Sequence, residues 1–153
     1  MKGRRISVRV DVSAPTLQIS KLRYWSRKNV VYILRANKPV RSPDNPELKK
    51  SRIVYIGESK QGAKRSANSL VAMSNRVFGE QRGVKQIDAH VLTFHGRQGL
   101  VARKLLEGYL LKVFEELYGD LPYCNRRGTS LIARKNPHFR RPRLVSILEK
   151  LSS

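Results

Sequence analysis

Alternating apolar and polar positions predict the β-strands of this chain. From Ile6 to Val12 every second residue is apolar, a pattern typical of a half-buried strand. Two runs rich in β-branched and aromatic residues predict strands at 29–35 and 52–56. Alternation returns in 86–94 and predicts a further strand. We expect Gly57 to end the second of the apolar strands.

Apolar residues at helical spacing predict three helices. They cover 61–78, 100–118 and 142–151, and the middle helix has the most regular apolar face. Gly119 directly follows that helix and is a typical helix-ending residue. The segment 38–50 contains three prolines and few apolar residues, so it predicts a long loop between the first two strands of the sheet.

The order of these elements indicates an α/β (α+β) fold. Residues 29–153 give strand, strand, helix, strand, helix, helix, which predicts a small, three-stranded, mainly antiparallel sheet flanked by helices. We expect one domain here, with a basic segment at its C-terminal end. Residues 1–28 form a basic N-terminal extension to it.

Charge is the strongest compositional signal. The 153 residues carry a formal net charge of +21, while 40% hydrophobic residues are enough to form a core. Such an excess of positive charge predicts a polyanionic partner, and nucleic acid is the commonest one. A ribosomal protein or a merely solubilising surface is the alternative interpretation of the charge alone.

Cysteine content and hydropathy limit the expected cellular location of the protein. Cys124 is the single cysteine, which excludes an intrachain disulfide and a cysteine-rich zinc site and favours a cytoplasmic location. No apolar run approaches the ~20 residues that a membrane-spanning helix needs. We therefore expect the positive charge to bind a soluble partner, and we expect no association with a membrane.

Five polar residues in ordered positions are candidates for chemistry. Each also has an ordinary structural explanation. A tyrosine in a strand usually packs in the core, and an arginine on a helix is usually exposed to solvent. An asparagine is common in turns, and Glu107 can form an ion pair with Arg103 four residues earlier. Glu58, directly after Gly57, is a possible second carboxylate, with a surface loop as the expected setting. The five candidates are Tyr32, Tyr55, Arg65, Glu107 and Asn125.

The spacing of these residues resembles that of the GIY-YIG nuclease family. The resemblance rests on Val30-Val31-Tyr32, on Tyr55-Ile56-Gly57, on Arg65 ten residues beyond Tyr55, on Glu107 within a long helix and on Asn125 after Leu121-Pro122. It covers about residues 29–128. Val30 stands where the family usually has glycine, and Ser69 stands one helical turn after Arg65, where some members carry histidine.

The resemblance implies a metal-dependent endonuclease. Tyr32, or the water network it holds, would be the general base, Tyr55 would position the nucleophile, and Arg65 would bind the phosphate. Glu107 would hold one Mg²⁺ or Mn²⁺, because a hard carboxylate oxygen suits these ions. Asn125 would orient a partner or hold the loop after the helix.

Double-stranded DNA is the expected substrate. Basic residues near the C-terminal end would contact its backbone, which positions a duplex without reading its sequence. A module that keeps this fold and binds nucleic acid without cleaving it is the alternative. The expected nucleic-acid-binding residues are Arg126, Arg127, Arg134, Lys135, Arg140, Arg141 and Arg143.

Overall fold

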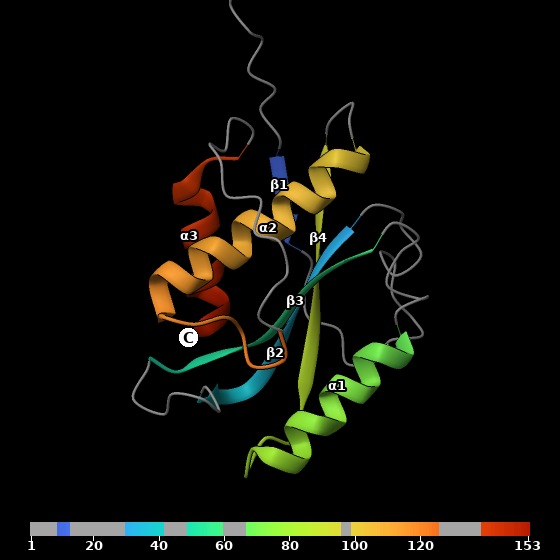
Figure 1. Cartoon of the computed structure of the whole chain (residues 1–153), viewed down its shortest axis with the longest axis vertical. Helices are drawn as coiled ribbons and strands as arrows, with labels where there is room; N and C mark the ends of the chain where they lie inside the picture. The colour runs from blue at the N-terminus through green and yellow to red at the C-terminus, as the bar shows by residue number, and fades with distance from the viewer. Residues whose placement is uncertain (1–8, 13–29, 42–48, 60–66, 96–98, 126–138) are drawn as a thin grey trace, which may run out of the picture.

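Seven elements make up the described part of the chain. The computed structural model describes residues 9–12, 30–41, 49–59, 67–95, 99–125 and 139–153. The strands are β1 (Arg9–Val12), β2 (Val30–Val40), β3 (Ser51–Ser59) and β4 (Ile87–His95), and the helices are α1 (Ala67–Glu80), α2 (Gly99–Tyr118) and α3 (Arg141–Ser152) (Figure 1). Within these ranges, no helix has both the length and the apolar character needed to cross a bilayer.

The strands form one antiparallel sheet in the order β1-β4-β2-β3. The predicted α+β class is confirmed: β2, β3 and β4 are the three expected strands, and helices flank them. In addition, β1 extends this sheet by pairing with β4, with Val10 opposite Phe94. The alternation in the N-terminal extension therefore marks a real strand, and β3 lies at the opposite edge of the sheet.

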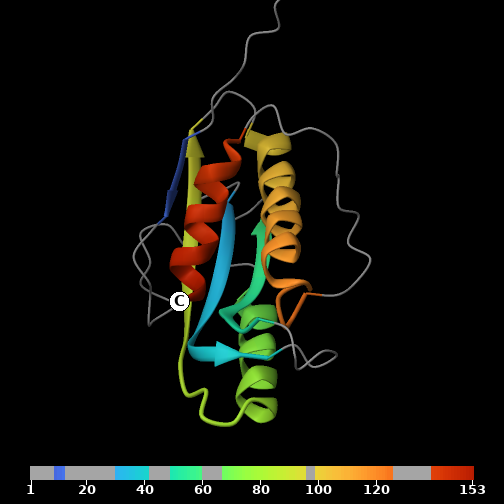
Figure 2. The same ribbon diagram turned by 90° about the vertical axis from the view of Figure 1, so that its left-hand side faces the viewer.

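Two hydrophobic cores lie on opposite faces of the sheet. Val31 and Ile33 face α2 and α3, and their core continues through Leu106 and Leu148. Tyr32 and Leu34 belong to the other core, which includes Leu70 of α1. Figures 1 and 2 show the same arrangement, with α2 and α3 together on one side and α1 on the other. The alternation of β2 thus sends every second side chain to a different helix layer.

The paired strands β2 and β3 are both longer than the sequence predicts. β2 continues through Pro39 to Val40, which is paired with Ser51, so the start of the expected loop is wrong. β3 does not end at Gly57, since it runs on to Ser59 opposite Val30. The backbone ladder with β2 maintains β3 there, although glycine has a weak intrinsic preference for strands.

The helices follow their predicted faces. α2 and α3 begin and end within one residue of the predicted bounds, whereas the described part of α1 starts at Ala67 and residues 61–66 lie outside the described part. Gly119 ends α2 with a φ of +83°, and its N–H donates to the carbonyl of Glu115 at 2.8 Å. This left-handed conformation explains why glycine stands there.

The end of α3 is fastened to the sheet by Arg35. Its Nε donates to the carbonyl of Leu151 at 2.8 Å, and its Nη2 donates to the carbonyl of Ser153 at 2.6 Å. These acceptors are carbonyls at the C-terminal end of a helix, where a cation is favourable. One side chain therefore links β2 to the last turn of the chain.

Replacing this guanidinium should loosen α3. We expect Arg35→Leu to lower the free energy of unfolding by about 1–3 kcal/mol, because two charge-assisted hydrogen bonds are lost. Urea unfolding followed by circular dichroism measures the change. Arg76→Leu is the control, since its exposed pair with Glu80 contributes at most ~0.5 kcal/mol. Equal losses in both variants would contradict the role given to Arg35.

Candidate active site

Two tyrosines meet over a glycine on the α1 face of the sheet. Tyr32 lies opposite Gly57 and Leu34 lies opposite Tyr55, so both tyrosine side chains lie on one face, diagonal to each other. Their ring centroids are 5.9 Å apart at an interplanar angle of 36°. A Cβ on Gly57 would lie 2.5 Å from Cε1 of Tyr55 and 2.7 Å from the hydroxyl oxygen of Tyr32. Only glycine leaves room for this pair.

The two hydroxyls have different surroundings. Tyr32 is 3% exposed, whereas Tyr55 is partly exposed. Burial raises the pKa of Tyr55, and the carboxylates of Glu107 and Glu58 add to that rise. A hydrogen bond with the Tyr32 side chain acts in the opposite direction and lowers the pKa of Tyr55. Tyr55 is therefore the more accessible member of the pair, and Tyr32 stabilises its phenolate form.

Glu107 reaches the same region from α2. It is partly buried, and its negative charge adds to the rise in the pKa of Tyr55. Burial, first, and then the neighbouring charge of Glu58 raise the pKa of Glu107 to about 7. Arg103 and Lys104 oppose this rise. The expected site carboxylate thus lies beside the tyrosine pair, in a position where losing its proton is unfavourable.

Glu58 and Arg103 form an ion pair that the sequence analysis missed. Arg103 Nε lies 2.7 Å from Glu58 Oε2, and Arg103 is only 5% exposed. The surface loop expected for Glu58 is wrong, because β3 continues and turns this side chain toward α2. The expected partner of Arg103 was Glu107, but its salt bridge joins it to Glu58 instead. A usable signal was present: Arg103 lies within the apolar arc of its helix.

Asn125 holds the outer edge of β3. Its Oδ1 accepts from the amide of Ile56 at 3.0 Å and its Nδ2 donates to the carbonyl of Ile56 at 2.9 Å. The amide of Cys124 also donates to the carbonyl of Val54 at 2.7 Å. The backbone amide and carbonyl groups in these contacts lie on the outer edge of β3, where no further strand of the described sheet pairs with them. Asn125 therefore positions the strand that carries Tyr55.

The donor set fits a hard divalent cation. Glu58 and Glu107 provide neighbouring carboxylates, and carboxylate oxygens are preferred ligands of Mg²⁺. Glu58 Oε2 is buried and has no hydrogen-bond partner among the described residues, although Arg103 lies close to it. Those residues include no group of three or more His, Cys, Asp or Glu side chains that could hold a metal. A cation here would need water and substrate oxygens to complete its shell.

The remaining predicted residues divide into two sets. Arg65 lies outside the described residues, and so do Arg126, Arg127, Arg134 and Lys135. The second set, at the start of α3, is exposed, and Arg141 Nη2 donates to Glu116 Oε2 of α2 at 2.7 Å. The members of this exposed set are Arg140, Arg141 and Arg143.

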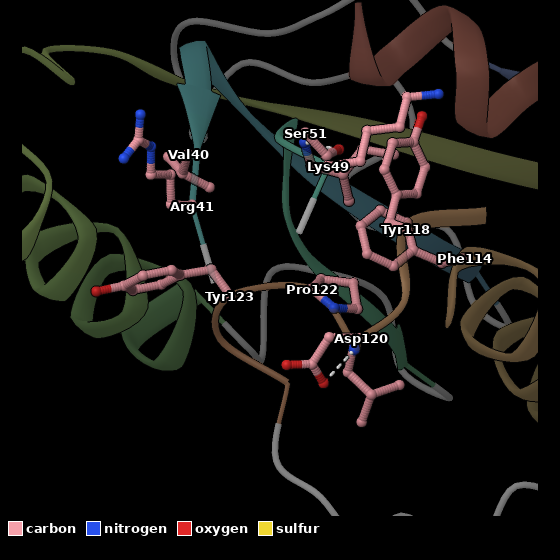
Figure 3. A pocket seen from close by; sticks show the side chains of 11 residues that line it. Val40, Arg41, Lys49, Ser51, Phe114, Tyr118, Asp120, Pro122 and Tyr123 are labelled. Carbon is pink, nitrogen blue, oxygen red and sulfur yellow. Dashed lines mark hydrogen bonds between the residues drawn. The ribbon is translucent and has the colours of Figure 1, made fainter. Parts of the chain in front are cut away.

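A hollow at the other end of β3 is separate from this site. Val40, Phe114 and Pro122 are among the residues that line it, and none of the tyrosine-pair or carboxylate residues does (Figure 3). Lys49 Nζ lies 5.2 Å from the centre of the Tyr118 ring at its rim. Asp120, Lys49 and Arg41 are among its polar lining residues, but none of the five residues predicted for the active site lies there.

Comparison of the chain with models of known protein families, with curated proteins and with solved structures gives no match. The geometry described above is therefore the basis for any functional conclusion.

Adding one methyl group at Gly57 should disturb the tyrosine pair. We expect Gly57→Ala to lower the free energy of unfolding by about 1–3 kcal/mol, because both rings must shift to admit the new Cβ. Urea unfolding measures this loss. Gly79→Ala is the matched control, since a Cβ there meets nothing within 4 Å. If Gly57→Ala were as stable as Gly79→Ala, the two rings would not close over Gly57 in solution.

The charge of Glu58 should be measurable at Glu107. In metal-free protein we expect the Glu107 carboxyl to titrate with a pKa of about 7, and Glu58→Gln to lower that pKa by removing a like charge. Carbon-detected NMR of labelled glutamate measures both values. A pKa near the ordinary 4.5 that does not respond to Glu58→Gln would contradict this arrangement.

The same shift has a definite effect on stability. Between pH 4.5 and about 7 the folded protein keeps a proton on Glu107 that the unfolded chain has released. The stability contributed by this proton is complete below pH 4.5 and is lost as the pH rises through about 7. Glu107→Gln should therefore flatten this part of the pH dependence of thermal unfolding.

Proposed function

We propose that this protein is a metal-dependent endonuclease that hydrolyses phosphodiester bonds in double-stranded DNA. The observation that carries the proposal is the contact between the Tyr32 and Tyr55 rings, together with the electrostatic effect of the partly buried Glu107 carboxylate on Tyr55. The order and spacing of these residues resemble the GIY-YIG nucleases, which supports the same chemistry. The cytoplasmic location expected from the single cysteine belongs to this proposal.

The tyrosine pair would activate the attacking water. A general base must take the water's proton, and the Tyr55 oxygen is the accessible acceptor of the two. The hydrogen bond from Tyr32 lowers the cost of forming a Tyr55 phenolate, while burial raises it. The division of roles is therefore reversed from the one that the resemblance implies, with Tyr55 nearest to the water and Tyr32 behind it.

Two carboxylates and one arginine would supply the remaining contacts with the metal ion and the phosphate. Glu107, with Glu58 beside it, would hold one Mg²⁺ or Mn²⁺, which when bound offsets charge on the scissile phosphate and leaving oxygen. A charge-neutralised Glu107 would also no longer raise the pKa of Tyr55. Arg65 is proposed to bind the phosphate, since a guanidinium matches phosphate oxygens with two parallel hydrogen bonds.

The net charge of +21 supports a polyanionic substrate. The proposed backbone contacts are the exposed arginines at the start of α3 together with the predicted basic residues between 126 and 135. Each neutralised phosphate makes binding weaker as salt rises, so affinity should fall steeply with ionic strength.

A nucleic-acid-binding module without catalysis is the second candidate. Tyr32 is almost fully buried and the pKa of Tyr55 is raised, so neither tyrosine is a ready base in the free protein. Val30 in place of the glycine typical of the family points in the same direction. Salt-sensitive binding without any cleavage would favour this candidate.

Cleavage by point variants tests the proposal. We expect wild-type protein to nick supercoiled plasmid when Mg²⁺ or Mn²⁺ is present, and Glu107→Gln and Tyr55→Phe each to slow nicking by about 10²-fold or more. Glu149→Gln, which neutralises an exposed carboxylate near the end of α3, and Tyr118→Phe in the distant hollow are the controls and should nick at the wild-type rate. Rates come from single-turnover gels in excess protein.

Two results would contradict the proposal. Nicking that is equal in wild type and Glu107→Gln would point to a contaminating nuclease or another site. No cleavage of DNA or RNA with either metal, together with tight binding, would leave only the non-catalytic module.

A further inference from the structure

Gly108 is an unexplained glycine in the interior of α2. A Cβ built on it meets no heavy atom within 4 Å, so close packing among the described residues does not require glycine there. Its φ is not positive, unlike those of Gly83 and Gly119, so backbone conformation does not require it either. Glycine in a helix interior is destabilising relative to alanine. Neither packing of the described residues nor backbone conformation therefore explains the missing side chain.

Two lysines flank Gly108 on a partly exposed face of α2. Lys104 and Lys112 lie one turn before and one turn after it on the same face of the helix, and Lys104 is exposed. Glu107 is the adjacent residue, and Lys104 precedes it by three positions, which places both within one turn of the helix. Glu115, one turn beyond this stretch, marks the end of the positive face.

We propose that the face formed by Lys104, Gly108 and Lys112 is the surface on which the phosphate backbone of a nucleic acid lies, with Gly108 giving it clearance beside Glu107. This inference rests on the proposed nuclease function and deepens it by locating the substrate strand. Without a side chain at Gly108, a sugar-phosphate backbone approaches the helix closely, and the two lysines contact it on either side.

The dimensions suit this arrangement. Eight residues of α-helix span about 12 Å, which exceeds the ~3.4 Å axial spacing of successive phosphates in one strand, so the two lysines contact different phosphates. α2 lies along β3, the strand that carries Tyr55 (Figure 2). A backbone following this helix face therefore passes Glu107, the residue next to Gly108 and the proposed metal ligand.

A bulky residue at Gly108 should raise the stability of the protein and weaken its binding to nucleic acid. We expect Gly108→Ala and Gly108→Leu to raise Tm by about 2–4 °C, because helix propensity improves and nothing in the described structure is displaced. Gly108→Leu should nevertheless weaken binding to a fluorescent 30-base-pair duplex about tenfold, with Gly108→Ala intermediate. Anisotropy in EDTA measures binding without cleavage, on DNA and RNA duplexes separately, so that the preferred backbone is identified.

Matched variants control the comparison. Gly79 of α1 also has nothing within 4 Å of a built Cβ, so Gly79→Ala and Gly79→Leu should bind as wild type. Lys104→Ala and Lys112→Ala should each reduce the slope of log affinity against log salt by about 0.9, the value for one lost phosphate contact.

The outcomes separate this inference from the nuclease function. If wild type binds and cleaves while Gly108→Leu binds with unchanged affinity, the inference is overturned and the nuclease proposal stands. A fall in Tm for Gly108→Leu would show that the chain itself packs on Gly108, which also overturns the inference. If wild-type protein neither binds nor cleaves either duplex, the nuclease proposal fails and the inference fails with it.

Discussion

The absence of a side chain at Gly57 is the constraint on which the candidate site depends. The two tyrosine rings occupy the space that a Cβ would need, and the backbone of β3 continues past this point without interruption. A methyl group there would force the rings apart and remove the hydrogen bond through which Tyr32 stabilises a Tyr55 phenolate. The absence of a side chain at Gly57 thus allows the Tyr32 and Tyr55 side chains to pair over this strand.

β3 brings together groups from three directions. Its α1 face carries Tyr55, its other face sends Glu58 to Arg103 of α2, and its free edge is held by Asn125. The ion pair connects the strand to the helix of Glu107, so the tyrosine pair and the carboxylate are positioned by the same strand. An outer strand suits this role, since an inner strand would have no free edge to hold a loop.

The sequence predicted the fold better than the details of the site. Periodic apolar residues are enough to locate β2, β4 and α2, because burial on one face leaves a clear pattern. Glycine was expected to end β3, yet pairing with β2 overrides its weak strand preference, and that error placed Glu58 in a surface loop. The apolar arc of α2 could have marked Arg103 as buried, but its partner Glu58 could not be foreseen, since the pair depends on how a strand and a helix 40 residues apart in the sequence pack together.

The central claim is that a hard cation binds at Glu107 next to Tyr55, and terbium luminescence excited through tyrosine tests it most directly. Tb³⁺ takes the oxygen ligands of Ca²⁺ and Mg²⁺, and it emits when an excited aromatic ring lies close by. The account predicts saturable emission in wild-type protein that Mg²⁺ displaces, that falls in Tyr55→Phe and that is absent in Glu107→Gln. Emission of equal strength in wild type and Glu107→Gln would contradict it.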